Sequence, residues 1–200
     1  MSGGAARVLL ALLAACSAAP APAPWRPVTA WRPVVFGGDG EVRADGEALV
    51  LEPGNPLTGV VFDAALPTAD YEVELLATRA GGVDFFCALT VPTARGNLSL
   101  VLGGWGGAVC GLSSLDGRDA ARNETRTLRH FEPDRPYRVR LRVLRDRVQA
   151  FVDDAPLLGA DLTGREVGVR VELDLCQPFG YATYQTAAIV RDVRWRPLGP

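Results

Sequence analysis

The residues best suited to chemistry are two carboxylates close together in the chain, Glu172 and Asp174, in the segment Glu172-Leu173-Asp174-Leu175-Cys176-Gln177. Side chains alternate between the two faces of a β-strand, so a strand here would place both carboxylates on one face and the two leucines on the other. Enzymes that cleave glycosidic bonds use such pairs of carboxylates. We therefore predict Glu172 and Asp174 as catalytic residues, with hydrogen-bonding or solvated surface groups as the alternative.

A second set of residues is suited to binding. Trp105 lies among four glycines in segment 103–107, where a ligand can approach the backbone and a sugar can stack on the indole ring. The alternative is a tight hairpin whose indole folds back over the core. Asp116, Asn123 and Glu124 follow, and we expect them at the rim of the same site, although such residues also suit a solvated loop.

Composition excludes several kinds of chemistry. All 21 basic residues are arginine, which excludes Schiff-base catalysis and lysine-dependent phosphate loops. His130 is the single histidine, so a histidine metal cluster is excluded, and a catalytic triad with Ser113 or Ser114 would lack the Gly-x-Ser-x-Gly turn. We expect no cofactor. The alternative is a calcium ion held by oxygen ligands whose spacing is not that of an EF-hand, namely Asp116, Asp119, Asn123 and Glu124.

Charge and cysteine content narrow the partners further. The net charge of −2 and the isoelectric point of about 5.5 argue against nucleic acid as a partner. Cys87, Cys110 and Cys176 lack Cys-x-x-Cys spacing, so we expect no structural zinc and at most one disulfide among them. Ten arginines lie in segment 118–147, and we expect them to form ion pairs and cover apolar surface rather than bind an anion.

The elements that must position these residues are β-strands, because the apolar period along the chain is two. In Tyr137–Val143 apolar side chains alternate with three arginines, as a sheet with one wet face requires. The same alternation is found in Tyr71–Ala77, Asp84–Val91, Leu98–Leu102, Val148–Val152, Val167–Leu175 and Ala188–Trp195. Segment 118–128 is the single helical candidate, and its polarity favours a loop. The pattern predicts an all-β, two-sheet antiparallel sandwich.

The N-terminal segment has the organisation of an export signal. Arg7 precedes an apolar run, Val8 to Cys16, that is too short to cross a bilayer as a helix. The run ends in Leu-Ala-Ala-Cys, which resembles the bacterial lipobox, whose cysteine receives a diacylglycerol and becomes the first residue. An ordinary signal peptide cleaved near Ala15 or Ala19 is the alternative, and both place the domain outside the cytoplasm.

Three regions follow from this organisation. The lipobox resemblance implies a lipoprotein signal peptide at residues 1–15 and a lipidated Cys16 that anchors the protein to a bacterial cell envelope. Residues 16–30 form an Ala/Pro-rich tether. Residues 31–200 form a single sandwich domain, a length sufficient for a real core.

The order of strands and turns in the last third resembles known families. The segment Tyr137–Val152, two strands joined by a turn, resembles the hairpin of concanavalin A-like and laminin G-like sandwiches. Gly164–Val171, Gly180–Thr183 and Ile189–Trp195 resemble the last strands of the 3-keto-disaccharide hydrolase family. The resemblance covers roughly residues 34–198. It implies a jelly-roll fold in an exported protein that cleaves 3-keto-glycosides by hydrolysis or elimination.

The chain departs from two family patterns at sites that matter for catalysis. Asp84–Leu89 stands where the 3-keto-disaccharide hydrolases have an Asn-Ser-Gly-plus-aromatic strand, so no catalytic residue is carried over from them. The segment around Glu172 resembles the Glu-x-Asp-x-x-Glu signature of laminarinase-type retaining glycosidases, with Gln177 in place of the general acid. An amide cannot deliver a proton, so that route is disfavoured. Gln177 and Tyr181 are instead predicted to bind substrate.

Two classes of function remain. The first is an enzyme acting on 3-keto-glycosides, which the family resemblance favours. The second is a non-catalytic carbohydrate-binding or cell-surface interaction module, which the scarcity of acid and base groups favours. Both predict a glycan ligand, contact with the membrane through a lipid anchor alone, and no nucleic acid.

Overall fold

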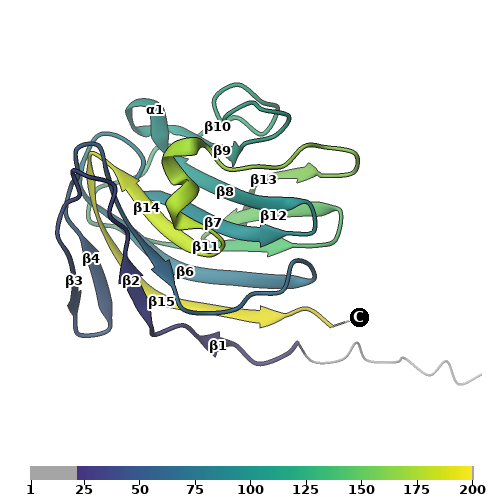
Figure 1. Ribbon diagram of the computed structural model, residues 1–200, viewed down its shortest axis with the longest axis horizontal. Coiled ribbons are helices and arrows are strands. Elements are labelled where there is room, and N and C mark those ends of the chain that lie inside the picture. Colours follow the sequence, from purple (N-terminus) through teal and green to yellow (C-terminus); the bar gives the residue numbers. More distant parts are fainter. Residues whose placement is uncertain (1–21, 200) are drawn as a thin grey trace, which may run out of the picture.

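The computed structural model describes residues 22–199 as two antiparallel sheets packed face to face (Figure 1). The first sheet contains, in spatial order, β13 (Ala155–Asp161), β12 (Arg147–Val152), β11 (Pro136–Val143), β6 (Tyr71–Gly82), β15 (Thr186–Pro197), β4 (Ala48–Leu51) and β3 (Val42–Asp45), with β1 (Arg26–Pro27) paired to β15. The second contains β10 (Thr127–Leu128), β9 (Val109–Ser113), β8 (Gly96–Gly103), β7 (Cys87–Thr93), β14 (Gly180–Tyr184), β5 (Leu57–Phe62) and β2 (Trp31–Pro33). The predicted antiparallel jelly-roll sandwich is confirmed.

The main core lies between the sheets and is built by the predicted alternation. On β11, Val139, Leu141 and Val143 are fully buried among the apolar side chains of both sheets. The arginines between them point outward, where Arg142 binds the buried carboxylate of Glu72. For these three arginines of β11 the expected ion pairs are present, and Arg140 and Arg142 also lie over the ring of Phe151, whereas other arginines of segment 118–147, such as Arg118 and Arg122, have no ion pair among the described residues.

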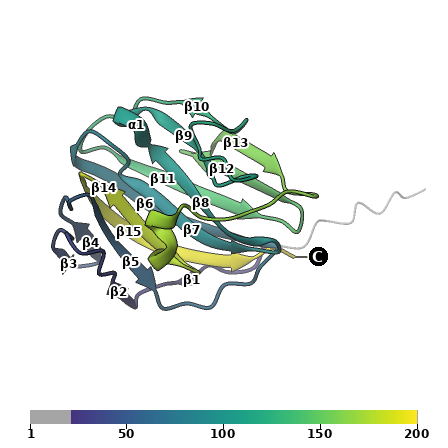
Figure 2. The same cartoon turned by 45° about the horizontal axis from the view of Figure 1, so that its top comes forward.

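One predicted strand is wrong. Segment 167–175 contributes an isolated bridge at Val167 and then the short 3₁₀-helix η1 (Val171–Cys176). Leu173 and Cys176 are the buried residues of η1, and their spacing of three is the period of a 3₁₀-helix. The helix lies across the outer face of the second sheet (Figure 2), so its apolar residues face that sheet instead of alternating. Segment 118–128 forms turns and β10, in agreement with the predicted loop.

The sandwich begins earlier than the predicted boundary at residue 31. Strand β1 lies inside the segment predicted as a tether and pairs with β15, Arg26 opposite Trp195. Just before it, the Trp25 ring lies under the guanidinium groups of Arg194 and Arg196, whose carbons are 5.0 and 4.3 Å from its centre. The predicted signal peptide and the lipidation site at Cys16 lie outside the described residues. Within residues 22–199 there is no helix long and apolar enough to cross a membrane.

The three cysteines of the domain are free thiols. Cys87, Cys110 and Cys176 are all buried, and none forms a disulfide. Burial raises the pKa of the Cys110 thiol to about 11 and that of the Cys176 thiol to about 12. These thiols therefore stay protonated at neutral pH and act as small apolar side chains.

Candidate functional site

A cavity of about 220 Å³ opens on the outer face of the second sheet, between η1 and the tight turn α1 (Gly104–Gly107). Both elements lie at the same end of the sandwich (Figure 1). The cavity is lined by Leu57, Asp84, Phe85, Val101, Trp105, Arg170, Glu172, Leu173 and Tyr184. Most of these side chains are apolar or aromatic, and three are charged, which is the composition of a ligand pocket.

Trp105 is held in place by a carboxylate from a distant part of the chain. Asp84 accepts hydrogen bonds from the backbone N–H groups of Trp105 and Gly106, each at 3.1 Å, and of Phe85 at 2.8 Å. These bonds support an unusual backbone, because Trp105 has a φ of 50° in the left-handed region. The indole remains 43% exposed, so the predicted alternative in which it folds over the core is wrong.

The buried Arg79 also holds the turn α1 through hydrogen bonds. The Nη2 of Arg79 donates hydrogen bonds to the carbonyls of Gly107 at 3.0 Å and Gly103 at 3.4 Å. Its guanidinium also lies over the Phe86 ring, 5.2 Å from the ring centre. Gly103 has a φ of 73°, and a Cβ there would lie 2.3 Å from the Arg79 side chain. The turn is therefore a rigid platform for Trp105.

The floor of the cavity is apolar. Phe85 and Tyr184 pack with their ring centres 5.6 Å apart, and Leu57, Val101 and Leu173 complete the cluster beneath η1. Phe85 and Phe86 lie just before β7, where the strand alternation is interrupted: Phe86 and Cys87 are both buried in the main core, while Phe85 faces the cavity.

The polar wall of the cavity is an ion-pair network at the start of η1. Arg170 donates from Nε and Nη2 to the two carboxylate oxygens of Glu172, and from Nη1 to Asp119 at 3.0 Å. The hydrogen bonds from Arg170 hold the pKa of the Glu172 carboxyl below its ordinary value, and they raise the pKa of Arg170. Glu172 is therefore ionised at neutral pH, which suits a hydrogen-bond acceptor or a base and not a general acid.

The structure separates the two carboxylates predicted to act together. Glu172 lines the cavity, but Asp174 lies on η1, where its Oδ1 accepts a hydrogen bond from the Gln177 amide at 3.2 Å. The Gln177 carbonyl in turn accepts a hydrogen bond from Asn97 at 2.6 Å. The predicted arrangement on one strand face is wrong, since the segment is helical, and Asp174 and Gln177 are outside the cavity lining.

Tyr181 is not a surface residue. Its side chain is fully buried in the core between the sheets, and its hydroxyl donates a hydrogen bond to the Phe86 carbonyl. A ring with no exposed surface cannot contact a glycan from solution. Its prediction as a substrate-binding residue is therefore wrong.

Asn123 holds its own loop together. Its amide donates to the carbonyls of Leu112, Arg118 and Asp119, and its carbonyl accepts from Thr125. The side chain is only 8% exposed, and every polar atom has a partner. The predicted ligand contact at Asn123 is replaced by a structural role.

Asp116 and Glu124 both form ion pairs with Arg165. Neither carboxylate lines the cavity that contains Trp105. Asp116 accepts hydrogen bonds from the Glu166 backbone N–H at 2.9 Å and from Arg165 at 2.6 Å, and these bonds lower its pKa. Arg165 also binds Glu124 and lowers its pKa. Both carboxylates attach loop 116–124 to the segment that leads to η1. Within residues 22–199, no group of three or more histidine, cysteine or acidic side chains could hold a metal ion.

Trp105 and Glu172 are the two cavity residues that were predicted; the other seven, Leu57, Asp84, Phe85, Val101, Arg170, Leu173 and Tyr184, were not. Asp84 and Arg170 act through contacts with residues far away in the sequence, and nothing near them in the chain indicates those contacts. Alternation does not indicate Phe85 or Tyr184 either. A period of two from the inward Cys87 and Leu89 of β7 would place Phe85 inward, and the inward position of Tyr181, which sets the outward face of Tyr184 on β14, was not predicted.

The fold and the cavity together define the class of this protein: it is a jelly-roll β-sandwich with a candidate ligand site on the outer face of one sheet. No family model matches the chain, and a search of curated proteins finds no match. A carbohydrate-binding module of family CBM66 from Bacillus subtilis has a similar structure, with a TM-score of 0.59 and 14% identity over 84% of this chain and 96% of the module. A galectin-like protein of unknown function from Bacillus subtilis gives a TM-score of 0.61 and 15% identity over 89% and 96% of the two chains.

A third similar structure was solved with a sugar. It is domain 4 of AbnA, an extracellular arabinanase of Geobacillus stearothermophilus, in complex with arabinotriose; the TM-score is 0.53 and the identity 13%, over 87% of this chain and 82% of that domain. Identities this low establish the fold, and function has to be argued from the site.

Proposed function

We propose that this domain is a non-catalytic carbohydrate-binding module that takes one sugar unit into the cavity beside Trp105. The observation that carries the proposal is the half-exposed indole, held rigidly by Asp84 over an apolar floor and facing the Arg170–Glu172 pair. The volume of about 220 Å³ is below the roughly 300–1,000 Å³ of pockets for drug-sized ligands, which suits a single small ring.

The chemistry of a sugar matches both parts of the cavity. One face of a pyranose or furanose ring presents C–H groups, which pack on an aromatic ring, while the hydroxyls at its edge need polar partners. Glu172 can accept hydrogen bonds from hydroxyls, and Arg170 can donate to ring or hydroxyl oxygens. The Arg170–Glu172 pair already holds both groups in position, so little side-chain freedom is lost on binding.

A glycan array followed by calorimetry with the best saccharide tests the proposal. Trp105→Ala should weaken binding by roughly 1–3 kcal/mol, about five- to a hundredfold, while leaving the fold intact. Val35→Ala removes an exposed apolar side chain outside the cavity, and it should leave affinity unchanged. Undiminished affinity in a folded Trp105→Ala protein would place the glycan site elsewhere.

The second candidate is the enzyme implied by the family resemblance, a hydrolase or lyase of 3-keto-glycosides. Glu172 supports it, because this carboxylate lines the cavity and stays ionised, as a base must. Glu172→Gln should then abolish turnover of 3-keto-glycosides while binding persists. If the wild-type protein turns over no 3-keto-glycoside, the binding module is the better description.

We also propose that the protein is exported and held at a bacterial cell envelope through a lipid on Cys16. Support comes from the apolar run that ends in Leu-Ala-Ala-Cys and from the Ala/Pro-rich segment after it. A glycan-binding domain in that position would meet polysaccharides of the envelope or of the surroundings.

A further inference from the structure

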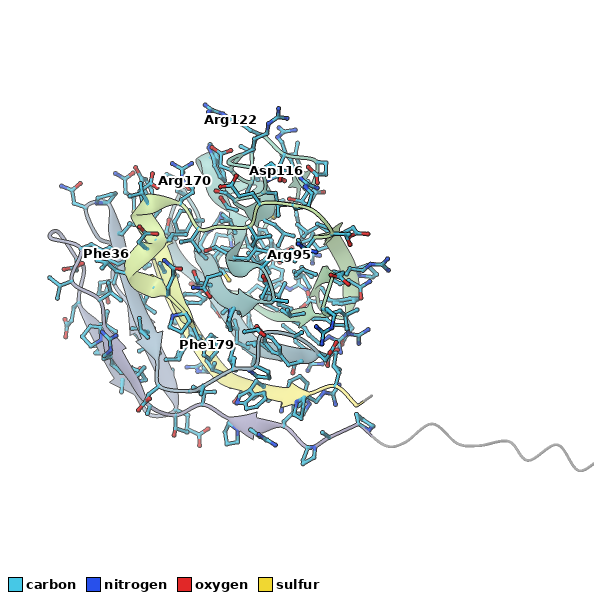
Figure 3. All side chains as sticks on the ribbon, turned by 45° about the vertical axis from the view of Figure 1, so that its right-hand side comes forward. Phe36, Arg95, Asp116, Arg122, Arg170 and Phe179 are labelled. Carbon is cyan, nitrogen blue, oxygen red and sulfur yellow. The ribbon has the colours of Figure 1, made fainter. Side chains whose placement is uncertain are left out.

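A second, polar pocket of about 350 Å³ adjoins the aromatic cavity. The two share Arg170 and Glu172, which therefore form the wall between them. The remaining lining comes from loop 114–122 and the start of η1: Ser114, Gly117, Arg118, Asp119, Arg122 and Val171. Figure 3 shows Arg122, Arg170 and Asp116 at the same end of the molecule.

At this second pocket the carboxylates have ion-pair partners among the described residues, but two of the arginines do not. The two carboxylates that line it, Asp119 and Glu172, both bind Arg170, and the nearby Asp116 and Glu124, which are outside the lining, both bind Arg165. Arg165 and Arg170 thus each bind two carboxylates. Arg118 and Arg122 are exposed, and within residues 22–199 their side chains make neither an ion pair nor a hydrogen bond. Two guanidinium groups therefore keep all their donors available.

The loop that carries these two arginines is held by hydrogen bonds within the protein. Asn123 donates to the loop carbonyls of Arg118 and Asp119 and to the Leu112 carbonyl of β9, and Arg118 and Leu115 exchange backbone hydrogen bonds across the turn. Arg170 connects the loop to η1 through Asp119. The main chain below Arg118 and Arg122 is therefore fixed relative to the aromatic cavity.

We propose that the ligand is an acidic saccharide, with one unit in the aromatic cavity and the carboxylate or sulfate of the adjacent unit bound by Arg118 and Arg122. This inference rests on the proposed carbohydrate-binding function and names its ligand class. Guanidinium groups form paired, charge-assisted hydrogen bonds with carboxylates and sulfates. Glu172, on the wall between the pockets, accepts hydroxyl hydrogen bonds between the two units.

Matched saccharide pairs that differ only in charge provide the test. The probes are trigalacturonate with its methyl ester, and sulfated chondroitin oligosaccharides with their desulfated forms, titrated into the intact domain by calorimetry. An acidic member should bind about three- to tenfold more tightly than its neutral partner. The difference should shrink as salt increases, because exposed charges are screened. The uronate and sulfate arms distinguish the two sources of negative charge.

Variants of single arginines show which residues cause the preference for the acidic saccharide. Arg118→Gln and Arg122→Gln should each reduce affinity for the acidic member about three- to tenfold and leave affinity for the neutral member unchanged. Arg126→Gln makes the same change of charge at an exposed residue outside both pockets, and it should bind like the wild type.

The outcomes separate the two proposals. Equal affinity for both members of every pair, or no binding of any acidic probe, overturns the acidic ligand. The carbohydrate-binding function survives that result if a neutral saccharide binds in a Trp105-dependent manner. If no saccharide, acidic or neutral, depends on Trp105 for binding, the proposed function itself fails.

Discussion

At the scale of single residues, the candidate site depends on one carboxylate that holds the tryptophan turn in place. Asp84 accepts three backbone hydrogen bonds, two of them from turn α1, and it also lines the cavity. An exposed tryptophan on an unsupported glycine-rich turn would sample many conformations, and binding would have to order it. Asp84 removes most of that cost before a ligand arrives.

Asp84→Ala should therefore reduce saccharide affinity although the tryptophan is still present. We expect a loss of roughly two- to tenfold from the cost of ordering Trp105, about 0.5–1.5 kcal/mol. The free energy of unfolding should fall by about 1–3 kcal/mol, because backbone donors lose their acceptor. Calorimetry and urea denaturation measure the two effects.

Asp45→Ala is the matched control, because Asp45 is an exposed aspartate on β3 that is not in the cavity lining. It should leave affinity unchanged. Wild-type affinity in Asp84→Ala would show that the turn holds Trp105 without the carboxylate.

At the scale of elements, η1 is a part of the site that belongs to neither sheet. It packs on the outer face of the second sheet through Leu173 and Cys176, and it presents Glu172 to the cavity. Its position is decided by apolar contact with residues of β5, β8 and β14.

Two leucines on this helix make a matched pair. Leu173 is 2% exposed and Leu175 is 55% exposed. Leu173→Ala should lower the free energy of unfolding by about 2–5 kcal/mol and weaken saccharide binding, because the helix then loses its main anchor. Leu175→Ala should change stability by less than about 0.5 kcal/mol. Urea denaturation that gives equal values for the two variants would contradict this packing of η1.

The first sheet contains a carboxylate that makes stability depend on pH. Glu72 on β6 is fully buried and binds Arg142 of β11 and Arg196 of β15. Burial opposes its ionisation, but the hydrogen bonds from Arg196 and Arg142 outweigh burial and hold the pKa of Glu72 below its ordinary value. The ionised group thus stabilises the fold above the unfolded pKa of 4.5, and this contribution is lost as pH falls through the lower folded value.

Glu72→Gln should accordingly destabilise the domain by about 1–3 kcal/mol at pH 7, because two arginines lose a charged partner. The difference from the wild type should shrink as the pH falls below 4.5. Chemical denaturation at a series of pH values measures it. Glu132→Gln, at an exposed residue without an ion pair among the described residues, should behave like the wild type throughout.

At the scale of the whole molecule, the N-terminal segment and the cavity belong to different sheets. Trp25 and β1 are held against β15 of the first sheet, whereas α1 and η1 lie at the outer face of the second (Figure 1). The chain between Cys16 and Trp25 can span about 30 Å at most, from roughly 3.3–3.6 Å per residue. A lipid on Cys16 would therefore hold the start of the domain within about 30 Å of the membrane surface.

Anchoring itself is testable with one cysteine. Mass spectrometry of membrane-extracted protein should find a diacylglycerol on Cys16, and Cys16→Ser should release the protein from the membrane fraction. Ser17→Ala is the control and should remain in the membrane. A mature protein that begins at Ser17 or later without a lipid would contradict the anchor.

The sequence determined the architecture, because a sheet with one buried face imposes its period of two directly on the chain. The alternation of β11, with Val139 and Leu141 inward and arginines outward, identified both the element and its core face. Trp105 could also be singled out as a candidate from its place between glycines, but whether its ring is exposed or covers the core was decided by the tertiary structure.

The tertiary structure alone decided the composition of the site. Whether 171–176 becomes a strand or a helix depends on the sheet on which it packs, and the same letters are compatible with both. Asp84 reaches Trp105, and Arg170 reaches Asp119, across long stretches of chain. The burial of Tyr181 depends likewise on long-range packing. Such contacts leave no periodic signal in the sequence, because they are set by the distances between elements and not by the order of residues within one.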